Sequence, residues 1–107
     1  MKYHFIGIGG IGMSGLAMHL ASEGYQVYGS NYEENERVEY LRARGIGVCI
    51  GHSSENFDRP DLVIRTTAIK QGNPELVRAI SEDVPTIYRM ELLQKILAGN
   101  ISTCNTG

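Results

Sequence analysis

Short apolar runs alternate along this chain with segments whose apolar residues recur at helical spacing, a pattern typical of a parallel β-sheet with crossover helices. The expected strands are residues 3–8, 26–29, 47–50, 61–65 and 86–88. The expected helices are one through residues 13–20 that ends at Gly24, one over 34–44, one that begins at Asn73, and one over 90–98. The sequence therefore predicts an α/β fold, a Rossmann-like, doubly wound, five-stranded parallel sheet with helices on both faces.

The third expected helix has the clearest beginning. Asn73 is a favourable N-cap, and Pro74 follows at the first helical position, where its missing N–H costs nothing. Leu76, Val77 and Ile80 are the apolar residues that we expect this helix to bury.

Composition fits one domain and excludes several classes of partner. The chain has 107 residues, of which 42% are apolar, and its 10 Lys and Arg against 12 Asp and Glu include no basic run that could follow nucleic acid. No apolar run reaches the roughly 18 residues needed to cross a membrane. Cys49 and Cys104 share no CxxC or metal-ligand spacing, and the three histidines are scattered, so we expect no metal site and a reducing cytoplasmic location.

A glycine motif lies between the first expected strand and the first expected helix. Gly7, Gly9 and Gly12 form GxGxxG, in which they are expected to make a tight turn, admit a phosphate close to the backbone, and allow the helix to pack closely on the sheet, respectively. The free N–H groups of residues 11–14 would then face an anion at the positive end of the helix dipole. The pattern predicts a phosphate or diphosphate ligand, with these candidate contacts: Gly9, Gly10, Ile11, Gly12, Met13 and Ser14.

The end of the second strand bears on which nucleotide is bound. Domains that bind NAD usually place Asp or Glu here for the ribose hydroxyls. This chain has Ser30 and Asn31, and its first carboxylates, Glu33 and Glu34, come later. These residues disfavour NAD, although an amide can still hydrogen-bond a hydroxyl.

The segment from His4 to Gly15, His-Phe-Ile-Gly-Ile-Gly-Gly-Ile-Gly-Met-Ser-Gly, closely resembles the opening of the UDP-N-acetylmuramate:L-alanine ligases of the Mur ligase family. Later segments agree with that family in the same order, namely residues 27–31, 51–52, 66–70, 73–75 and 85–89. Together these matches extend over nearly all of the first 99 residues.

The resemblance implies an N-terminal domain, residues 1–99, that binds the UDP part of UDP-N-acetylmuramic acid in peptidoglycan precursor synthesis. Residues 100–107 would begin the linker or strand toward an ATP-binding central domain. ATP and Mg²⁺ would act in the full-length ligase, whose remaining domains are partners in cis, and this part would contain no catalytic residue. In that family, the reaction passes through an acyl phosphate on the lactyl carboxylate, which the amine of alanine attacks.

The resemblance also extends the candidate site beyond the glycine motif. The further candidate contacts to the uridine are Ser30, Asn31, His52, Thr67, Ala68 and Ile69. Two places depart from the family pattern. Asn31 stands where the family commonly has Asp, and residues 104–107 take the place of a GTHGKT-like ATP loop, so we expect the chain alone to bind without catalysing ligation.

Three other interpretations stay open at this stage. A muropeptide-recycling ligase of the same family shares the opening segment and the nucleotide sugar. An NAD-binding oxidoreductase domain shares the glycine motif. A regulatory module that senses a nucleotide without catalysis would have the same fold and loop.

Overall fold

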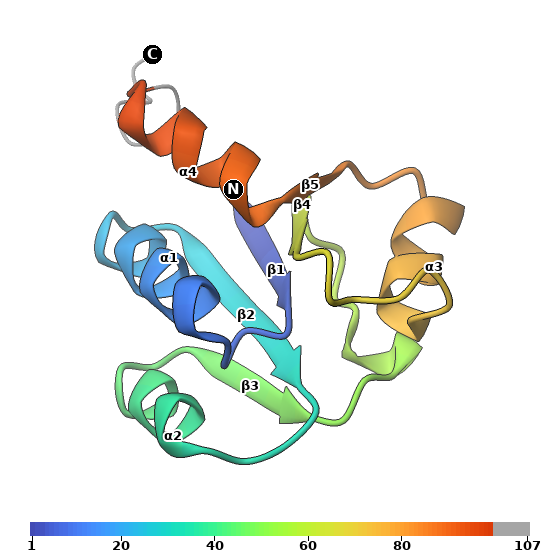
Figure 1. Cartoon of the computed structure of the whole chain (residues 1–107), viewed down its shortest axis with the longest axis horizontal. Helices are drawn as coiled ribbons and strands as arrows, with labels where there is room; N and C mark the ends of the chain where they lie inside the picture. Colours follow the sequence, from blue (N-terminus) through green and yellow to red (C-terminus); the bar gives the residue numbers. More distant parts are fainter. Residues whose placement is uncertain (100–107) are drawn as a thin grey trace.

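The computed structural model describes residues 1–99, and its five strands form one parallel sheet in the order β3-β2-β1-β4-β5 (Figure 1). The strands are β1 (Lys2–Ile6), β2 (Gln26–Asn31), β3 (Gly47–Ile50), β4 (Leu62–Arg65) and β5 (Thr86–Tyr88). The helices are α1 (Ile11–Ser22), α2 (Glu36–Ala43), α3 (Pro74–Ser81) and α4 (Arg89–Leu97), with a short 3₁₀ helix, η1 (Ser54–Asn56). The predicted doubly wound fold is confirmed, whereas the expected linker at residues 100–107 lies outside the described residues.

The strand order places a topological switch point between β1 and β4. The chain moves outward from β1 to β2 and β3, then returns to the other side of β1 to form β4 and β5. Loops that leave neighbouring strands in opposite directions open a crevice at the carboxyl edge of the sheet, where ligands of such folds bind.

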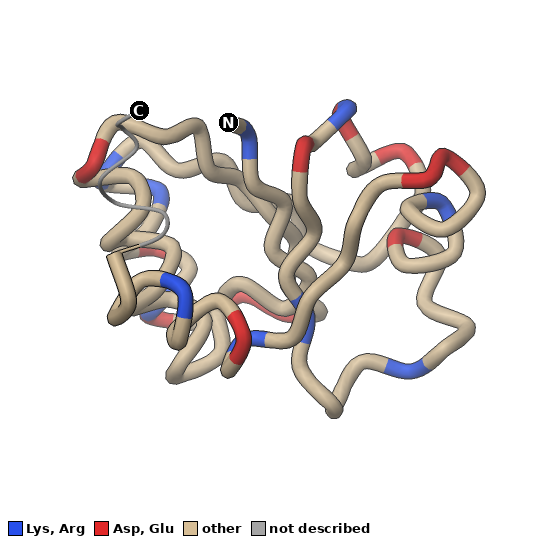
Figure 2. Tube along the Cα trace, turned by 90° about the horizontal axis from the view of Figure 1, so that it is seen from above, with Lys and Arg blue, Asp and Glu red and all other residues tan. Residues whose placement is uncertain are grey.

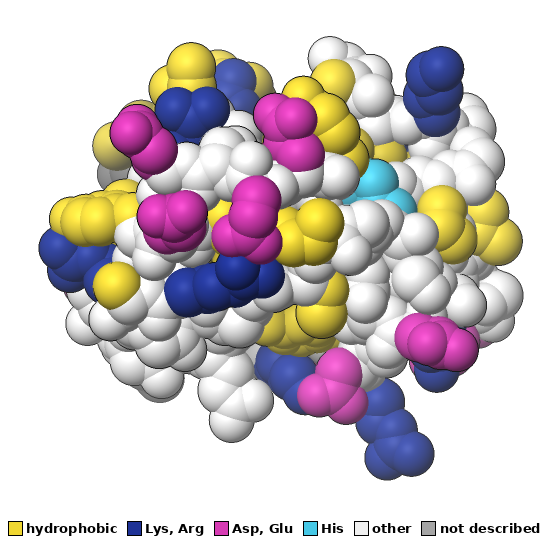
Figure 3. Space-filling model, turned by 90° about the horizontal axis from the view of Figure 1, so that it is seen from below, with side chains coloured by type: hydrophobic (Ala, Val, Ile, Leu, Met, Phe, Trp, Pro, Cys, Tyr) yellow, Lys and Arg dark blue, Asp and Glu magenta, His cyan; other side chains and the backbone are white. Residues whose placement is uncertain are grey.

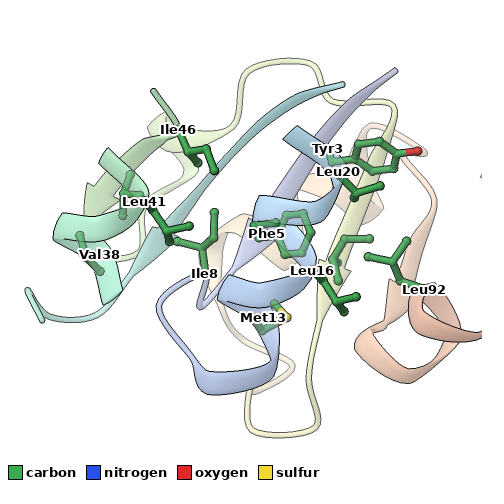
Figure 4. Packing of buried hydrophobic residues seen from close by; sticks show 13 residues of the cluster. Tyr3, Phe5, Ile8, Met13, Leu16, Leu20, Val38, Leu41, Ile46 and Leu92 are labelled. Carbon is green, nitrogen blue, oxygen red and sulfur yellow. The ribbon is translucent and has the colours of Figure 1, made fainter. Parts of the chain in front are cut away.

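Three helices cover one face of the sheet and one helix covers the other. In Figure 1, α1, α2 and α4 lie on one side, while α3 and η1 lie on the opposite side. The larger apolar core lies under the three helices, where Figure 4 shows Phe5 of β1 beside Leu16 of α1 and Leu41 of α2 beside Ile8. The smaller core beneath α3 consists of Ile6, Phe57, Val63, Leu76 and Ala79.

The predicted buried face of α3 is wrong for two of its three residues. Leu76 is buried, but Val77 and Ile80 are 50% and 61% exposed. The helix instead turns Glu75 and Ala79 toward the sheet, and Glu75 has no exposed surface. Hydropathy favours the apolar stripe, whereas the hydrogen bonds that Glu75 makes in the interior, described below, favour the observed rotation.

The predicted ends of the first two strands also need correction. β1 ends at Ile6, two residues earlier than expected, because Gly7 takes a positive φ of 85° and turns the chain. The N–H groups of Gly7 and Ile8 both donate to the carbonyl of Ser30, at 2.8 and 2.9 Å. β2 continues to Asn31, where it still pairs with β3.

The positions of acidic and basic residues are interspersed along the chain rather than gathered into one stretch (Figure 2). The formal net charge is -2. None of the helices within residues 1–99 has the length and apolar character needed to span a membrane.

Candidate functional site

A pocket of about 800 Å³ lies where β1, β2 and β4 end. This volume is within the range of small-molecule sites, about 300–1,000 Å³. In Figure 3, which views the molecule of Figure 1 from below, a histidine side chain is exposed among hydrophobic side chains and uncharged atoms. The lining residues are Gly7, Gly9, Gly10, Met13, Asn31, Tyr32, Glu33, Asn35, Arg37, His52, Thr66, Ala68, Ile69, Lys70, Gly72, Asn73 and Pro74.

The glycine loop presents unpaired backbone donors at the start of α1. Gly10 is the N-cap, so no side chain caps the helix, and its own N–H donates to Gly7 at 3.1 Å. The first helical bond runs from the N–H of Ser14 to the carbonyl of Gly10, at 2.9 Å. The N–H groups of residues 11–13 therefore remain available for an anion at the positive end of the helix.

Gly9 is held by an amide from the neighbouring strand. Its N–H donates to Oδ1 of Asn31 at 3.1 Å, and Nδ2 of Asn31 donates to the carbonyl of Glu33 at 2.8 Å. Nε of Arg37 donates to the carbonyl of Gly9 at 2.6 Å. A Cβ on Gly9 would lie 2.8–3.0 Å from the Asn31 amide. Gly9 thus makes room for Asn31, and this contact corrects the expectation that its missing side chain chiefly leaves room for phosphate.

Gly29, and not Gly12, has the packing role that the sequence assigned to Gly12. A Cβ on Gly12 would approach the side chain of Arg89 to 2.8 Å, and no atom of the sheet is among its nearest neighbours. A Cβ on Gly29, in β2, would lie 2.3 Å from the carbonyl oxygen of Phe5 and 3.0 Å from Cβ of Ile8. Gly29 is therefore the residue that lets the sheet and the glycine loop approach closely.

The loop after β4 is shaped by Arg65. Its Nη2 donates to the carbonyl of Ile69 at 2.6 Å and its Nε to that of Thr66 at 3.3 Å. The N–H of Ala68 donates to Oγ1 of Thr66, also at 3.3 Å. The guanidinium lies over the ring of Tyr88, 5.0 Å from its centre. These contacts hold one wall of the pocket against the end of β5.

Behind the pocket lies a buried polar cluster centred on Glu75. Oε1 of this carboxylate accepts from Oγ of Ser30 and lies against Nε2 of His4, both at 2.6 Å. Oε2 accepts from Nδ2 of Asn56 at 2.9 Å and from the N–H of Ser53 at 3.1 Å. Four separate segments of the chain thus meet at one carboxylate.

The cluster keeps Glu75 ionised and reaches the pocket through His52. Burial raises the pKa of Glu75, but hydrogen bonds from His4, Ser30 and Asn56 outweigh burial and lower it to about 2. Nδ1 of His52 lies 2.9 Å from Oγ of Ser30 and 3.4 Å from Oε2 of Glu75. His52 is thus in contact with the cluster on one side and with the pocket on the other.

The pocket brings together most, but not all, of the residues selected from the sequence. Those that line it are Gly9, Gly10, Met13, Asn31, His52, Ala68 and Ile69. Those that do not line it are Ile11, Gly12, Ser14, Ser30 and Thr67. Within residues 1–99, no group of three His, Cys, Asp or Glu side chains is arranged to hold a metal ion. Whether the selected residues contact a ligand stays a prediction.

The structure adds lining residues that sequence reasoning did not select. The segment from the end of β2 into α2 contributes Tyr32, Glu33, Asn35 and Arg37, and the segment from the end of β4 to the start of α3 contributes Lys70, Gly72, Asn73 and Pro74. Arg37 is exposed, and it also donates to the carbonyl of Gly9 in the glycine loop. The sequence signal for these residues is their position, because both segments follow strands whose ends lie at the carboxyl edge of the sheet, where the pocket forms.

Comparisons with known proteins point to one family. The model described as "Mur ligase family, catalytic domain" matches residues 2–100. The UDP-N-acetylmuramate–L-alanine ligase of Thermotoga maritima is 53% identical over 97 residues, which are 91% of this chain and 21% of that protein. The enzyme of the same name from Trichlorobacter lovleyi is 47% identical over 96 residues, or 90% of this chain and 21% of that protein. This chain therefore spans about a fifth of the length of these relatives.

Solved structures agree with the sequence matches. The crystal structure of the UDP-N-acetylmuramate–alanine ligase of Thermotoga maritima superposes with a TM-score of 0.91 at 50% identity, covering 94% of this chain and 24% of that one. The UDP-N-acetylmuramate:L-alanyl-γ-D-glutamyl-meso-diaminopimelate ligase from Neisseria superposes with a TM-score of 0.80 at 28% identity. That match covers 89% of this chain and 31% of the other.

Proposed function

Because this chain belongs to the Mur ligase family, we propose that it is the nucleotide-binding N-terminal part of a UDP-N-acetylmuramate:L-alanine ligase. It holds the UDP portion of UDP-N-acetylmuramic acid for peptidoglycan precursor synthesis. Among the solved structures, identity is 50% to the alanine ligase and 28% to the tripeptide-adding relative, which favours alanine as the amino acid that the whole protein adds.

The observation that carries the proposal is the combination of three free N–H groups and a pocket of about 800 Å³ at one edge of the sheet. The N–H groups of residues 11–13 bind the diphosphate with the positive end of the α1 dipole behind them. The nucleoside lies toward His52 and the loop of residues 66–70, which form another part of the lining.

Asn31 counts against an NAD ligand. An NAD site uses a free carboxylate at the end of the second strand to accept hydrogen bonds from the ribose. Here both functional atoms of the Asn31 side chain are engaged, with Gly9 and with Glu33. The position that would select NAD therefore serves to fix the glycine loop.

Residues 1–99 do not fit Mg²⁺ and ATP, so we derive no phosphoryl-transfer step from them. They contain no Gly-Lys-Thr loop, and no trio of metal-ligating side chains gathers among them. We assign ATP, Mg²⁺ and the incoming alanine to the rest of the ligase in cis. The contribution of this part is to bind and orient the nucleotide, so that the lactyl carboxylate of the sugar is presented to those domains.

Isothermal titration calorimetry of the chain with UDP, UDP-N-acetylmuramic acid and NAD tests the proposal. We expect both uridine nucleotides to bind more tightly than NAD. The control is the same titration of Ser22→Ala, because Ser22 is exposed on α1, lies outside the pocket and bonds only His19 among residues 1–99. Asn35→Ala is unsuitable as a control, since Asn35 lines the pocket. Tighter binding of NAD, or equal weak binding of all three ligands, would contradict the assignment.

A further inference from the structure

The buried cluster behind the pocket contains a chain of hydrogen bonds whose direction can be worked out. Glu75 is ionised, so both of its oxygens can only accept. Oγ of Ser30 lies 2.6 Å from Oε1, and the one hydrogen on that hydroxyl must therefore point to the carboxylate. Ser30 has no second hydrogen to give to His52.

The contact between Ser30 and His52 must then run in the opposite sense. Nδ1 of His52 lies 2.9 Å from the Ser30 oxygen, whose free lone pairs can accept. The same nitrogen lies 3.4 Å from Oε2 of Glu75, a second acceptor. Both neighbours favour a hydrogen on Nδ1, and a histidine's tautomer is set by the partner of one of its nitrogens.

The other ring nitrogen is left for a ligand. Nδ1 faces the cluster, while His52 also lines the pocket and its side chain is 19% exposed. None of residues 1–99 hydrogen-bonds Nε2 of His52. In a neutral ring that carries its hydrogen on Nδ1, Nε2 has only a lone pair.

On the premise of the nucleotide site proposed above, we propose that Glu75, acting through Ser30, fixes His52 as the Nδ1–H tautomer, so that Nε2 accepts a hydrogen bond from the nucleoside. Glu75 and Ser30 are positioning residues in this scheme, and His52 is the residue that touches the ligand. Three groups of a uridine nucleotide can donate here: the imide N–H of the base and the two ribose hydroxyls.

Nuclear magnetic resonance of the ¹⁵N-labelled chain at pH 8 reads the tautomer directly, without any ligand. We expect the ring nitrogen shifts of His52 to report a protonated Nδ1 and an unprotonated Nε2. A hydrogen on Nε2 in the unaltered chain would overturn the proposal, whether or not any nucleotide binds.

Ser30→Ala tests whether the cluster sets the tautomer. The substitution removes the nearer acceptor, at 2.9 Å from Nδ1, and leaves only the Glu75 oxygen at 3.4 Å, so we expect the spectrum of His52 to shift toward the Nε2–H form. Ser22→Ala, the matched control, deletes a hydroxyl that bonds only His19 among residues 1–99 and should leave His52 unchanged. An unchanged Nδ1–H form in folded Ser30→Ala would refute the positioning role.

Calorimetry then identifies the donor on the ligand. We expect Ser30→Ala to weaken UDP binding by roughly 3- to 10-fold, the effect of one hydrogen bond. The same comparison is made with N3-methyl-UDP, 2′-deoxy-UDP and 3′-deoxy-UDP. The analogue that lacks the donor should bind Ser30→Ala and the unaltered chain equally. If Ser30→Ala weakens the binding of all three analogues as much as it weakens the binding of UDP, Nε2 is not the acceptor. If UDP does not bind at all, the proposed nucleotide site is rejected. The tautomer of His52 is measured without a ligand, so that result is independent of nucleotide binding.

Discussion

Glu75→Gln should reduce the loss of unfolding free energy that this fold undergoes as the pH falls, by an amount that follows from the pKa of Glu75. The pKa of Glu75 is about 2 in the folded chain, against an ordinary value of 4.5. A carboxyl whose folded pKa is depressed contributes stability that is present above 4.5 and is lost as the pH falls toward 2. This lowering of the pKa corresponds to about 3 kcal/mol of unfolding free energy at neutral pH.

Most of that contribution disappears within a narrow range of pH. Between pH 5 and pH 3, proton linkage with these two pKa values removes about 2 kcal/mol of unfolding free energy. The glutamine variant has no carboxyl to titrate, so its stability should fall by about 2 kcal/mol less over the same interval. At neutral pH the unfolding free energy of the glutamine variant should be lower than that of the unaltered chain, because the N–H groups of its amide must face groups that donate to Glu75. These groups belong to Ser53, Asn56, Ser30 and His4.

Urea denaturation at pH 5 and pH 3, followed by circular dichroism, measures the difference. Glu82→Gln is a suitable control, since Glu82 caps the same helix but is exposed and pairs only with Arg78. It should follow the unaltered chain at both pH values. Parallel loss of stability in Glu75→Gln and the unaltered chain would mean that Glu75 is not a buried carboxylate held by hydrogen bonds.

Three glycine substitutions should differ in their effects on stability and UDP binding, because a new Cβ meets different neighbours at each position. Gly9→Ala displaces the Asn31 amide and should weaken UDP binding about tenfold in calorimetry, with a loss of about 1 kcal/mol in unfolding free energy. Gly29→Ala forces a Cβ to 2.3 Å from a backbone oxygen of β1, so we expect a loss of about 3 kcal/mol or more by urea denaturation. Gly12→Ala meets only the flexible Arg89 side chain and should cost less than about 1 kcal/mol in the same assay. Equal losses for Gly12 and Gly29 would contradict the assigned packing roles.

Periodicity predicts the architecture well because strands and helices are local events. The alternation of apolar runs with helical segments indicates every strand and every α-helix, though not the 3₁₀ helix η1, and the sheet edge where the pocket forms follows from parallel topology. The helix start at Asn73 is also local, and its side chain accepts from the N–H groups of Glu75 and Leu76 as the N-cap rule requires.

What the sequence does not reveal depends on partners far along the chain. Gly9 is small because of Asn31, 22 residues later, and no motif contains that pair. The rotation of α3 depends on Glu75 meeting His4 and Ser30, 71 and 45 residues earlier. Hydropathy treats a glutamate as a surface residue, so only the assembled fold discloses that this one is buried and paired.

The polar cluster beneath α3 has a consequence for local opening of the chain. The apolar core on that face is small, and α3 is attached to the sheet partly through Glu75. Detaching this helix would expose that small core, break the carboxylate's bonds and displace the pocket wall at residues 72–74. A ligand in the pocket therefore opposes that opening by mass action. Amide hydrogen exchange in α3 should slow when UDP is added, while exchange in α2, on the opposite face, should change little.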